Sequence, residues 1–250
     1  MPEISWGRAD LHMHTQASDG LLPVQDLLKY IQKLGTLDVI AITDHDTLDA
    51  SLWAYEHRKH YTFDIVPGVE ISSNDGHVLG WWVTKPIPAG LSLIETVTAI
   101  HEQGGIAILA HPFHIQMPNI AKRAWHYWRK PELLLEAGLD GLEIYNAGRV
   151  IPFTNAMAAY YAQRHNFAVS GSSDAHTAGA VGRGYTLFPG KTAHDLRQAI
   201  ETHQTIAKGR PWPLIDYWKF SLSLMRPLSR RRLAASLNSS QSNITPHSPQ

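Results

Sequence analysis

Nine histidine and acidic side chains in this sequence are spaced as the ligands of a cluster of divalent ions would be. They are His12, His14, Asp19, His45, Glu70, His77, His111, Asp174 and His176. Imidazole nitrogen and carboxylate oxygen bind zinc, manganese and iron, and ions held in this way turn water into a nucleophile at neutral pH. The pattern therefore favours a hydrolase that uses a metal-activated hydroxide.

Most of these side chains follow short apolar runs that are typical of β-strands. His12 and His14 are two residues apart, so both can point to the same side of an extended chain. Asp174 and His176 have the same spacing. Glu70 ends an apolar run that should be buried, and a buried carboxylate needs a cation or hydrogen-bond donors. Taken alone, a pair of histidines with this spacing could also lie on a half-exposed strand edge, whereas Glu70 is harder to explain by a structural role.

Several of the nine have a structural explanation when they are taken singly. A lone histidine after a strand, such as His45 or His111, more often caps a helix or forms a hydrogen bond. Asp19 before Gly20 is by itself a turn residue. The joint placement changes this interpretation, because independent accidents rarely put so many ligand-type side chains after successive strands.

Alternating strands and helices are expected to position these side chains. The strand candidates are Arg8–Leu11, Val39–Thr43, Ile65–Ile71, Val78–Val83, Ile106–Ala110, Gly141–Tyr145, Ala168–Ser172 and Tyr185–Phe188. The helix candidates are Pro23–Leu34, Leu48–His60, Leu91–Glu102, Pro152–Arg164 and Thr192–Glu201. Such alternation predicts βα units, a mostly parallel sheet and, at about eight strands, a barrel whose active site lies beyond the carboxyl ends of the strands.

The composition is that of one sizeable α/β domain. The chain has 250 residues, is 44% hydrophobic and has a formal net charge of +0, which argues against a general nucleic-acid binder. It has no cysteine, so it has no disulfide and no thiolate zinc site. Its 15 histidines are about twice the number expected for this length.

The two ends of the chain suggest its location and its domain boundary. The first residues lack a basic stretch followed by an apolar run, and no apolar run reaches the roughly 20 residues needed to span a bilayer. We therefore expect a cytoplasmic protein without a transmembrane segment. The domain is expected over residues 6–212, followed at 213–250 by a basic, Ser/Pro-rich, largely disordered tail. We expect this tail to be solvated or packed on the barrel rather than bound to a membrane surface or partner.

The motifs that carry these ligands resemble those of the PHP (polymerase and histidinol phosphatase) family. They occur in order as DLHMHT with SDG, AITDHD, VPGVE, GHVLGW, LAHP, GLEIYN, and GSSDAH followed by VGRGYT. The resemblance runs from about Trp6 to about Trp212 and is closest to stand-alone bacterial phosphoesterases. It implies a distorted (β/α)7 TIM-like barrel with a site for two or three divalent ions at the carboxyl ends of its strands.

The resemblance also implies how the ligands are shared. One ion would be held by His12, His14, Glu70 and Asp174; Glu70 would bridge to a second ion held by His77 and His111; and Asp19, His45 and His176 would hold the third. Members of the family have been associated with manganese, iron and zinc, and a nitrogen and oxygen ligand set is compatible with all three.

Phosphate recognition requires fixed cations near the ligands. Arg183 is the first choice, because a guanidinium group forks onto phosphate oxygens, and Arg149 is the second. Asn146 and His114 are further candidates for substrate contact. Glu143 is a candidate to orient a ligand or to pair with an arginine. The residues expected to carry catalysis are Glu70, Asp174, His176 and Arg183.

The function that these features predict is metal-dependent hydrolysis of a phosphate ester. The substrate would be a phosphomonoester or phosphodiester such as a nucleotide, a short oligonucleotide or a small phosphometabolite, and stable binding of long nucleic acid is not expected. Two alternatives stay open. One is an amidohydrolase-like enzyme that acts on amide or ester carbonyls, and the other is a non-catalytic metal-binding domain.

Overall fold

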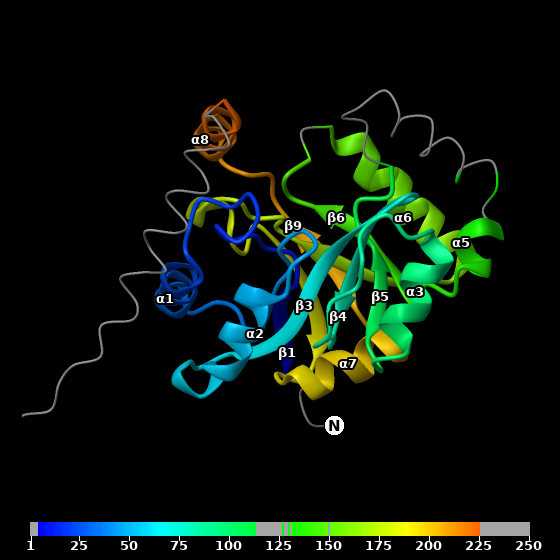
Figure 1. The fold of residues 1–250 in the computed structure, drawn as a ribbon, viewed down its shortest axis with the longest axis horizontal. Helices are drawn as coiled ribbons and strands as arrows, with labels where there is room; N and C mark the ends of the chain where they lie inside the picture. The colour runs from blue at the N-terminus through cyan, green and yellow to red at the C-terminus, as the bar shows by residue number, and fades with distance from the viewer. Residues whose placement is uncertain (1–4, 114–126, 128–129, 131, 150, 226–250) are drawn as a thin grey trace, which may run out of the picture.

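The computed structural model describes residues 5–113, 127, 130, 132–149 and 151–225. A single nine-stranded sheet curves into a nearly closed barrel, with strand order β7-β6-β5-β4-β3-β2-β1-β8-β9 (Figure 1). The strands are β1 (Trp6–Asp10), β2 (Val39–Ile42), β3 (Asp64–Ser73), β4 (Gly76–Trp81), β5 (Ile106–Leu109), β6 (Gly141–Asn146), β7 (Ala168–Ser172), β8 (Gly184–Pro189) and β9 (Ile206–Gly209).

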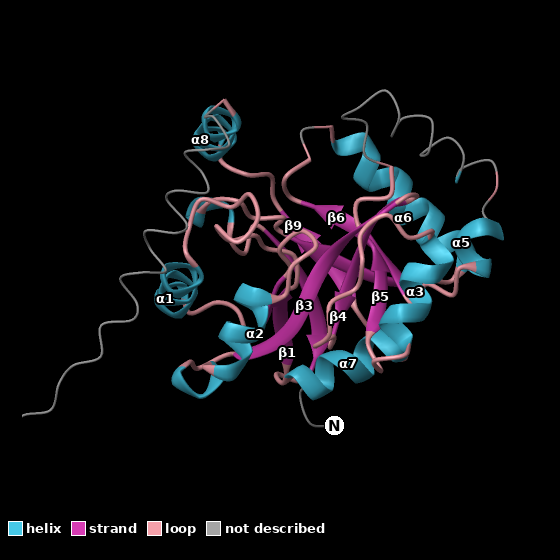
Figure 2. Ribbon diagram, in the orientation of Figure 1, coloured by secondary structure: helices cyan, strands magenta, loops and turns pink. Residues whose placement is uncertain are grey.

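Helices cover the outside of this sheet (Figure 2). They are α1 (Val24–Leu34), α2 (Asp49–Glu56), α3 (Leu93–His101), α5 (Glu132–Glu136), α6 (Pro152–His165), α7 (Ala193–Glu201) and α8 (Leu214–Leu224), with short 3-10 turns η1 (Arg58–His60) and η2 (Ala178–Ala180). Capping boxes begin α3 at Ser92 and α7 at Thr192, which satisfies backbone N–H groups that have no partner within the helix. The predicted α/β barrel is therefore confirmed.

The sheet is mixed, so the expectation of a mostly parallel sheet was wrong. Strands β1–β2, β2–β3, β5–β6 and β6–β7 pair in parallel, whereas β3–β4, β4–β5, β1–β8 and β8–β9 are antiparallel. The physical reason at β4 is the tight turn after β3, because two neighbouring strands joined by so few residues can pair only in antiparallel fashion. This pairing departs from a regular repeat of seven βα units.

Polar and apolar contacts tie the barrel together. The Trp81 side chain of β4 is fully buried, and its indole N–H donates to the Leu11 carbonyl at 3.0 Å. Because β1 and β4 are not neighbours in the sheet, this bond crosses the barrel interior. The two ends of the sheet approach each other where the Thr186 hydroxyl of β8 accepts from the Gly171 N–H of β7 at 3.0 Å. These contacts hold the strand ends in fixed relative positions.

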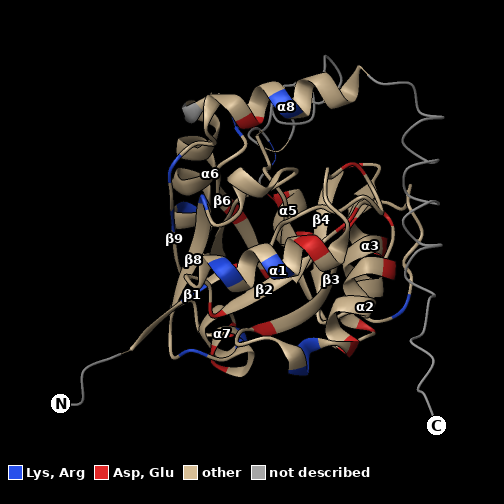
Figure 3. Ribbon diagram, turned by 90° about the vertical axis from the view of Figure 1, so that its left-hand side faces the viewer, with Lys and Arg blue, Asp and Glu red and all other residues tan. Residues whose placement is uncertain are grey.

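The chain continues past the barrel into α8, which lies across the top of the molecule in Figure 3. The domain boundary expected at residue 212 falls just before this helix, and the rest of the expected tail, residues 226–250, lies outside the described residues. Acidic and basic residues are interspersed along the ribbon in the same view, in keeping with the net charge of +0. In the described part of the chain, no helix is both long and apolar enough to cross a membrane.

Candidate metal centre

The structure brings all nine predicted ligands into one cluster at one end of the barrel. His12 and His14 follow β1, His45 follows β2, His111 follows β5, and Asp174 and His176 follow β7. Glu70 and His77 lie within β3 and β4, and Asp19 lies in the loop that precedes α1. Segments from almost the whole length of the barrel therefore meet at this point.

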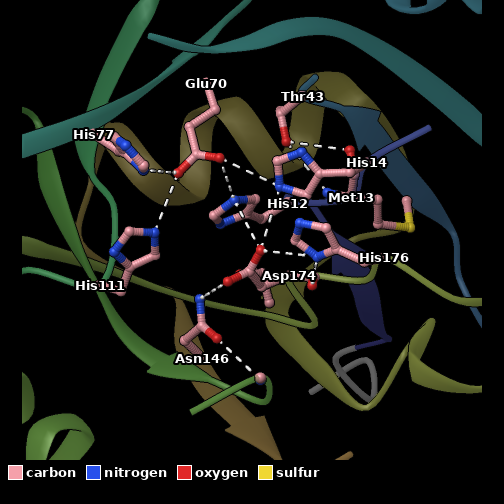
Figure 4. Close-up of polar contacts among 12 residues, drawn as sticks. His12, Met13, His14, Thr43, Glu70, His77, His111, Asn146, Asp174 and His176 are labelled. Carbon is pink, nitrogen blue, oxygen red and sulfur yellow. Dashed lines mark hydrogen bonds and ion pairs between the residues drawn. The ribbon is translucent and has the colours of Figure 1, made fainter. Parts of the chain in front are cut away.

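The carboxylate of Glu70 is the hub of the cluster (Figure 4). It is 1% exposed and lies on a buried strand, and five imidazoles contact it. Its imidazole neighbours, with the separation of the nearest nitrogen from a carboxylate oxygen, are His77 (Nδ1, 2.8 Å), His12 (Nε2, 3.1 Å), His111 (Nε2, 3.1 Å), His14 (Nε2, 3.3 Å) and His45 (Nδ1, 3.3 Å).

Two further carboxylates complete the cluster. Asp174 Oδ1 lies 3.3 Å from His14 Nε2 and 3.4 Å from His12 Nε2. Asp19 Oδ1 lies 3.0 Å from His176 Nε2. His14 and His176 also stack, with ring centroids 4.2 Å apart. The carboxylates of Asp174 and Asp19 thus face imidazole nitrogens across distances that an ion between them could bridge.

The donor geometry fits divalent ions. Ligand atoms around an ion bound at about 2.1 Å are separated from one another by roughly 3.0–3.4 Å, the range in which most of these contacts fall. Four groups have all their donor atoms within 4.8 Å of one another: His14, Asp19, His45 and His176; His12, His14 and Asp174; His12, Glu70 and His111; and His45, Glu70 and His77.

An orphaned nitrogen gives a second test of this fit. His14 is 2% exposed, and its Nε2 makes no hydrogen bond although two carboxylate oxygens lie 3.3 Å away. A buried polar atom without a hydrogen bond is costly, so its position needs another partner. A cation held between the imidazole and the two carboxylates provides one.

Hydrogen bonds outside the cluster fix the orientation of the imidazoles. His12 Nδ1 donates to Glu143 Oε1 at 2.9 Å, which turns Nε2 towards Glu70 and Asp174. His176 Nδ1 donates to the Asp174 carbonyl at 2.8 Å, which leaves Nε2 facing Asp19. Partners of this kind set the tautomer and raise the basicity of a ligand. Glu143, which we considered as an orienting residue, makes the first of these contacts.

The buried carboxylate of Asp10 is a positioning group that the sequence patterns did not identify. It accepts the Ser173 N–H at 2.9 Å and the Gly182 N–H at 2.8 Å, and so ties β1 to the loop that carries Asp174. Complete burial raises the pKa of Asp10 to about 6. Its signal in the sequence is an acidic residue inside a strand that is otherwise apolar, close before the HxH pair.

Two of the candidate ligands have left-handed backbone conformations. His111 has φ 31° and Asp174 has φ 52°. Residues with a β-carbon pay of order 1–3 kcal/mol for such geometry, which is concentrated at functional sites. In both cases the unusual turn comes directly after a strand and directs the side chain back into the cluster.

The electrostatic environment keeps the acidic members ionised. Burial alone would raise the pKa of Glu70, but His12, His45 and His77 hold that pKa well below its usual range. Asp174 is buried as well, and His12 and Arg149 hold its pKa well below normal. Negative charge is therefore maintained at the positions where cations would bind.

Protons compete with metal ions for three of the imidazoles. Burial lowers the pKa of His12, His77 and His176, yet carboxylates outweigh burial and the net shift is upward from 6.5 in each case. Metal binding must displace these protons, so the affinity of metal-depleted protein for zinc or manganese should rise about tenfold or more per pH unit between about pH 6 and 8.

Competition with a chelating dye of known pH dependence would measure this effect. The variant His12→Ala loses one displaced proton and should show a shallower slope. An affinity of the wild-type protein that does not change over this pH range would contradict the assignment of these imidazoles as ligands.

A cavity of about 390 Å³ opens above the cluster. Seven of the nine ligand candidates line it, whereas His12 and His14 lie beneath its floor. Its other walls include Ser73, Asp75, Gly76, Leu109, Ala110, Pro112, Tyr127, Arg149 and Phe220. A small substrate can therefore reach the ligand cluster through this cavity.

Among the described residues that line the cavity, Arg149 is the only arginine or lysine. Its Nη2 is paired with Asp174 Oδ2, and its Nε donates to Asn146 Oδ1 at 3.1 Å. Asn146 in turn donates to Asp174 Oδ2 at 3.1 Å. Arg183, our first choice for phosphate, is not part of this lining, and its Nε donates to the Gly179 carbonyl at 3.3 Å.

His114, the remaining candidate for substrate contact, lies outside the described residues. Asp44, the residue before His45, is fully buried and accepts from the Thr15 N–H, the Thr15 hydroxyl and the Ser18 hydroxyl at 2.6–2.7 Å. These bonds favour a structural role for Asp44 in shaping the loop that carries Asp19.

Comparisons with known proteins found relatives in sequence and in structure. A family model described as PHP-associated matches residues 152–205. An uncharacterized protein of Methanocaldococcus jannaschii is 32% identical over 151 residues, which is 56% of this chain and 82% of that protein. The 5'-3' exoribonuclease Rnm of Salmonella typhimurium is 43% identical over 88 residues, but these are 32% of this chain and 29% of the enzyme.

Solved structures share the architecture. A two-domain protein of Bacteroides vulgatus that contains a predicted PHP-like metal-dependent phosphoesterase superposes with a TM-score of 0.65 at 18% identity. The match covers 84% of this chain and 67% of that one. The fold and the ligand cluster define an α/β barrel with a cluster of potential ligands for divalent metal ions. The chain belongs to the PHP family.

Proposed function

We propose that this protein hydrolyses a phosphate ester with the help of two or three divalent ions held by the nine-residue cluster. The observation that carries the proposal is the placement of Arg149 at the edge of that cluster, in the same cavity. Three carboxylates and six imidazoles supply the ligands, and a guanidinium beside them supplies the fixed positive charge that a phosphoryl group requires.

The chain's residues have distinct tasks in this proposal. Bound divalent ions would supply a nucleophile from water at neutral pH and would offset charge on the phosphoryl oxygens. Glu70 and Asp174 face the centre of the cluster and hold the ligand imidazoles in place. His176 Nε2 faces Asp19 at the cavity wall, where the two side chains would together contribute ligands to one of the ions. His12 and His14 are buried beneath the cavity, which excludes water from this part of the site.

Arg149 is proposed to orient the phosphoryl group. Its guanidinium has five donors, and only part of this capacity is used by Asn146 and Asp174. The remaining N–H groups are available to a phosphate oxygen. Its contact with Asp174 also links substrate binding to the ligand cluster, because the carboxylate both pairs with the arginine and contacts His12 and His14.

We propose that the substrate is a nucleotide, a short oligonucleotide or another small phosphorylated molecule. The cavity volume of about 390 Å³ suits a molecule of this size. The similarity of one segment to a 5'-3' exoribonuclease supports a nucleotide-like substrate. The net charge of +0 and the presence of one arginine among the described lining residues do not favour stable binding along a polymer.

The test uses chelated, purified protein with manganese, iron(II) or zinc added back. Hydrolysis of p-nitrophenyl phosphate and of bis-p-nitrophenyl phosphate is expected to depend on added metal. The double variant His12→Ala/Glu70→Ala is the control. The ratio of the two rates separates a phosphomonoesterase from a phosphodiesterase.

A negative result has a defined meaning in this assay. If protein shown to contain metal ions hydrolyses neither phosphate ester but does hydrolyse p-nitrophenyl acetate, the proposal is replaced by hydrolysis of carbonyl substrates. If it hydrolyses none of the three, a non-catalytic metal-binding role is the better description.

A further inference from the structure

Hydrogen bonds join helix α8 and the residues just before it to two loops. One loop carries Asp174 and His176, and the other carries Arg149. Trp212, just before the helix, donates its indole N–H to the Ser173 carbonyl at 2.7 Å. Asp216, in its first turn, accepts from the Thr177 hydroxyl at 2.9 Å. These contacts fall on either side of Asp174 and His176, so the helix is positioned against the segment that holds these two side chains.

A third contact and a close approach reinforce this attachment. The Tyr217 hydroxyl donates to the Ala147 carbonyl at 3.2 Å, beside Asn146 on the other loop. A β-carbon added at Gly179 would lie 2.3 Å from an Asp216 carboxylate oxygen, so the backbone of η2 approaches the helix as closely as only glycine allows. Helix α8 is therefore held by specific contacts as a wall of the site.

The inner face of this helix presents an aromatic ring to the cavity. Phe220 is half-buried and lines the cavity, and its ring centroid is 4.2 Å from that of His176. Trp212 lies behind both rings, with centroids 5.9 Å from His176 and 6.1 Å from Phe220. One face of Phe220 is thus supported by packing, and the residue still contributes to the cavity surface.

The cavity lining contains side chains of two chemical kinds. The ligand cluster and Arg149 are polar or charged, whereas Phe220, Tyr127, Pro112, Leu109 and Ala110 contribute apolar surface. A substrate that is a phosphate alone would use only the first. A molecule with a phosphoryl group at one end and a flat apolar group at the other would use both, because aromatic rings stack on planar groups and exclude water from them.

We infer that Phe220 is a specificity-determining residue whose ring packs against the base of a nucleotide substrate. This inference rests on the proposed phosphoesterase function and assigns the organic part of its substrate. The phosphoryl group would lie at Arg149 and the ligand cluster, and the base would lie along the wall formed by α8. Stacking of a base on an aromatic side chain is tolerant of sequence, so Phe220 selects for a base without selecting which one.

The experiment compares phosphate esters that carry a base with esters that do not. Metal-loaded protein is assayed with AMP and ribose 5-phosphate, and with thymidine 5'-p-nitrophenyl phosphate and methyl p-nitrophenyl phosphate. The variant is Phe220→Ala, and Trp218→Ala is the matched control, because Trp218 lies on the same helix but is 60% exposed. Phe220→Tyr is the conservative variant, since it keeps a ring that can stack.

Phe220→Ala is expected to lower kcat/KM for the base-containing member of a pair by about 5- to 150-fold, mainly through KM, and to leave the base-free member within about twofold. Trp218→Ala should change neither member, and Phe220→Tyr should restore most of the loss. Equal loss on both members, or loss of bound metal, would overturn the inference, because Phe220 would then act by supporting His176.

A binding measurement tests the role of Phe220 even if the proposed hydrolysis is not observed. If the wild-type protein turns over no phosphate ester, equilibrium binding of AMP and ribose 5-phosphate to metal-loaded protein still tests the inference. Tighter binding of AMP that disappears in Phe220→Ala supports it. Equal affinity for the two ligands in the wild-type protein overturns it.

Discussion

Replacing Glu70 with glutamine is expected to reduce phosphate-ester hydrolysis by about 10³-fold or more and to lower the amount of bound metal. The carboxylate contacts five imidazoles and belongs to two of the four groups of potential ligands. Metal ions contribute several kcal/mol to transition-state stabilisation, and each 1.36 kcal/mol is tenfold in rate. Glutamine keeps the size of the side chain but removes its charge. Turnover and metal content, measured on the same samples, check this prediction.

The matched control for this variant is Glu102→Gln, which makes the same chemical change on an exposed residue just after α3. It should leave both activity and metal content unchanged. Circular dichroism would show whether Glu70→Gln still folds. Without the charge of Glu70, the neighbouring imidazoles can lose their protons and become neutral. The substitution then leaves no unpaired buried charge, so the fold should survive. A folded Glu70→Gln protein with full metal content and wild-type rate would refute the central role of Glu70.

Replacing Arg149 with alanine is expected to lower kcat/KM by about 10- to 150-fold and to weaken inhibition by inorganic phosphate to a similar degree. The estimate follows from the roughly 1.5–3 kcal/mol that a hydrogen bond to a charged group contributes. Lysine at this position should recover only part of the loss, because it lacks the planar fork of the guanidinium. Steady-state kinetics and phosphate inhibition constants provide the measurement.

Arg183→Ala is the matched control, since it removes a guanidinium that lies outside the described cavity lining. We expect it to leave phosphate inhibition unchanged. The reverse result, with a strong effect of Arg183→Ala and none of Arg149→Ala, would support the choice made from sequence alone. Metal content should be measured for both variants because Arg149 is paired with Asp174.

The barrel and the ligand positions could be predicted because their signals are local. Most of the candidate ligands come within a few residues after an apolar run, and the carboxyl ends of strands in a barrel meet at one end. Glu70 was identifiable because a carboxylate in a buried run requires a partner. The arrangement of Asp174 and His111 could be anticipated less well, since it depends on left-handed turns that no residue type at those positions indicates.

Other features depend on contacts between distant segments. Strand β9 was not predicted, because its four residues are mostly exposed and show no alternation. Helix α8 was not predicted as a helix, because apolar residues occur on both of its faces, Phe220 towards the cavity and Leu214 and Trp218 towards solvent. The choice between Arg149 and Arg183 depends on side-chain directions in two loops, which spacing along the sequence does not determine.

The place of β1 in the sheet has a consequence for how the protein folds. One edge of β1 pairs with β2, close in sequence, but the other edge pairs with β8, near the opposite end of the chain. Contacts of such long range slow folding, and at synthesis rates of roughly 5–20 residues per second the second edge stays unpaired for many seconds. The bridge between Met13 and Ala175 forms only after β7 has been made. The metal centre is therefore assembled late in folding, and the newly made chain is most prone to aggregation before β8 covers the open edge of β1.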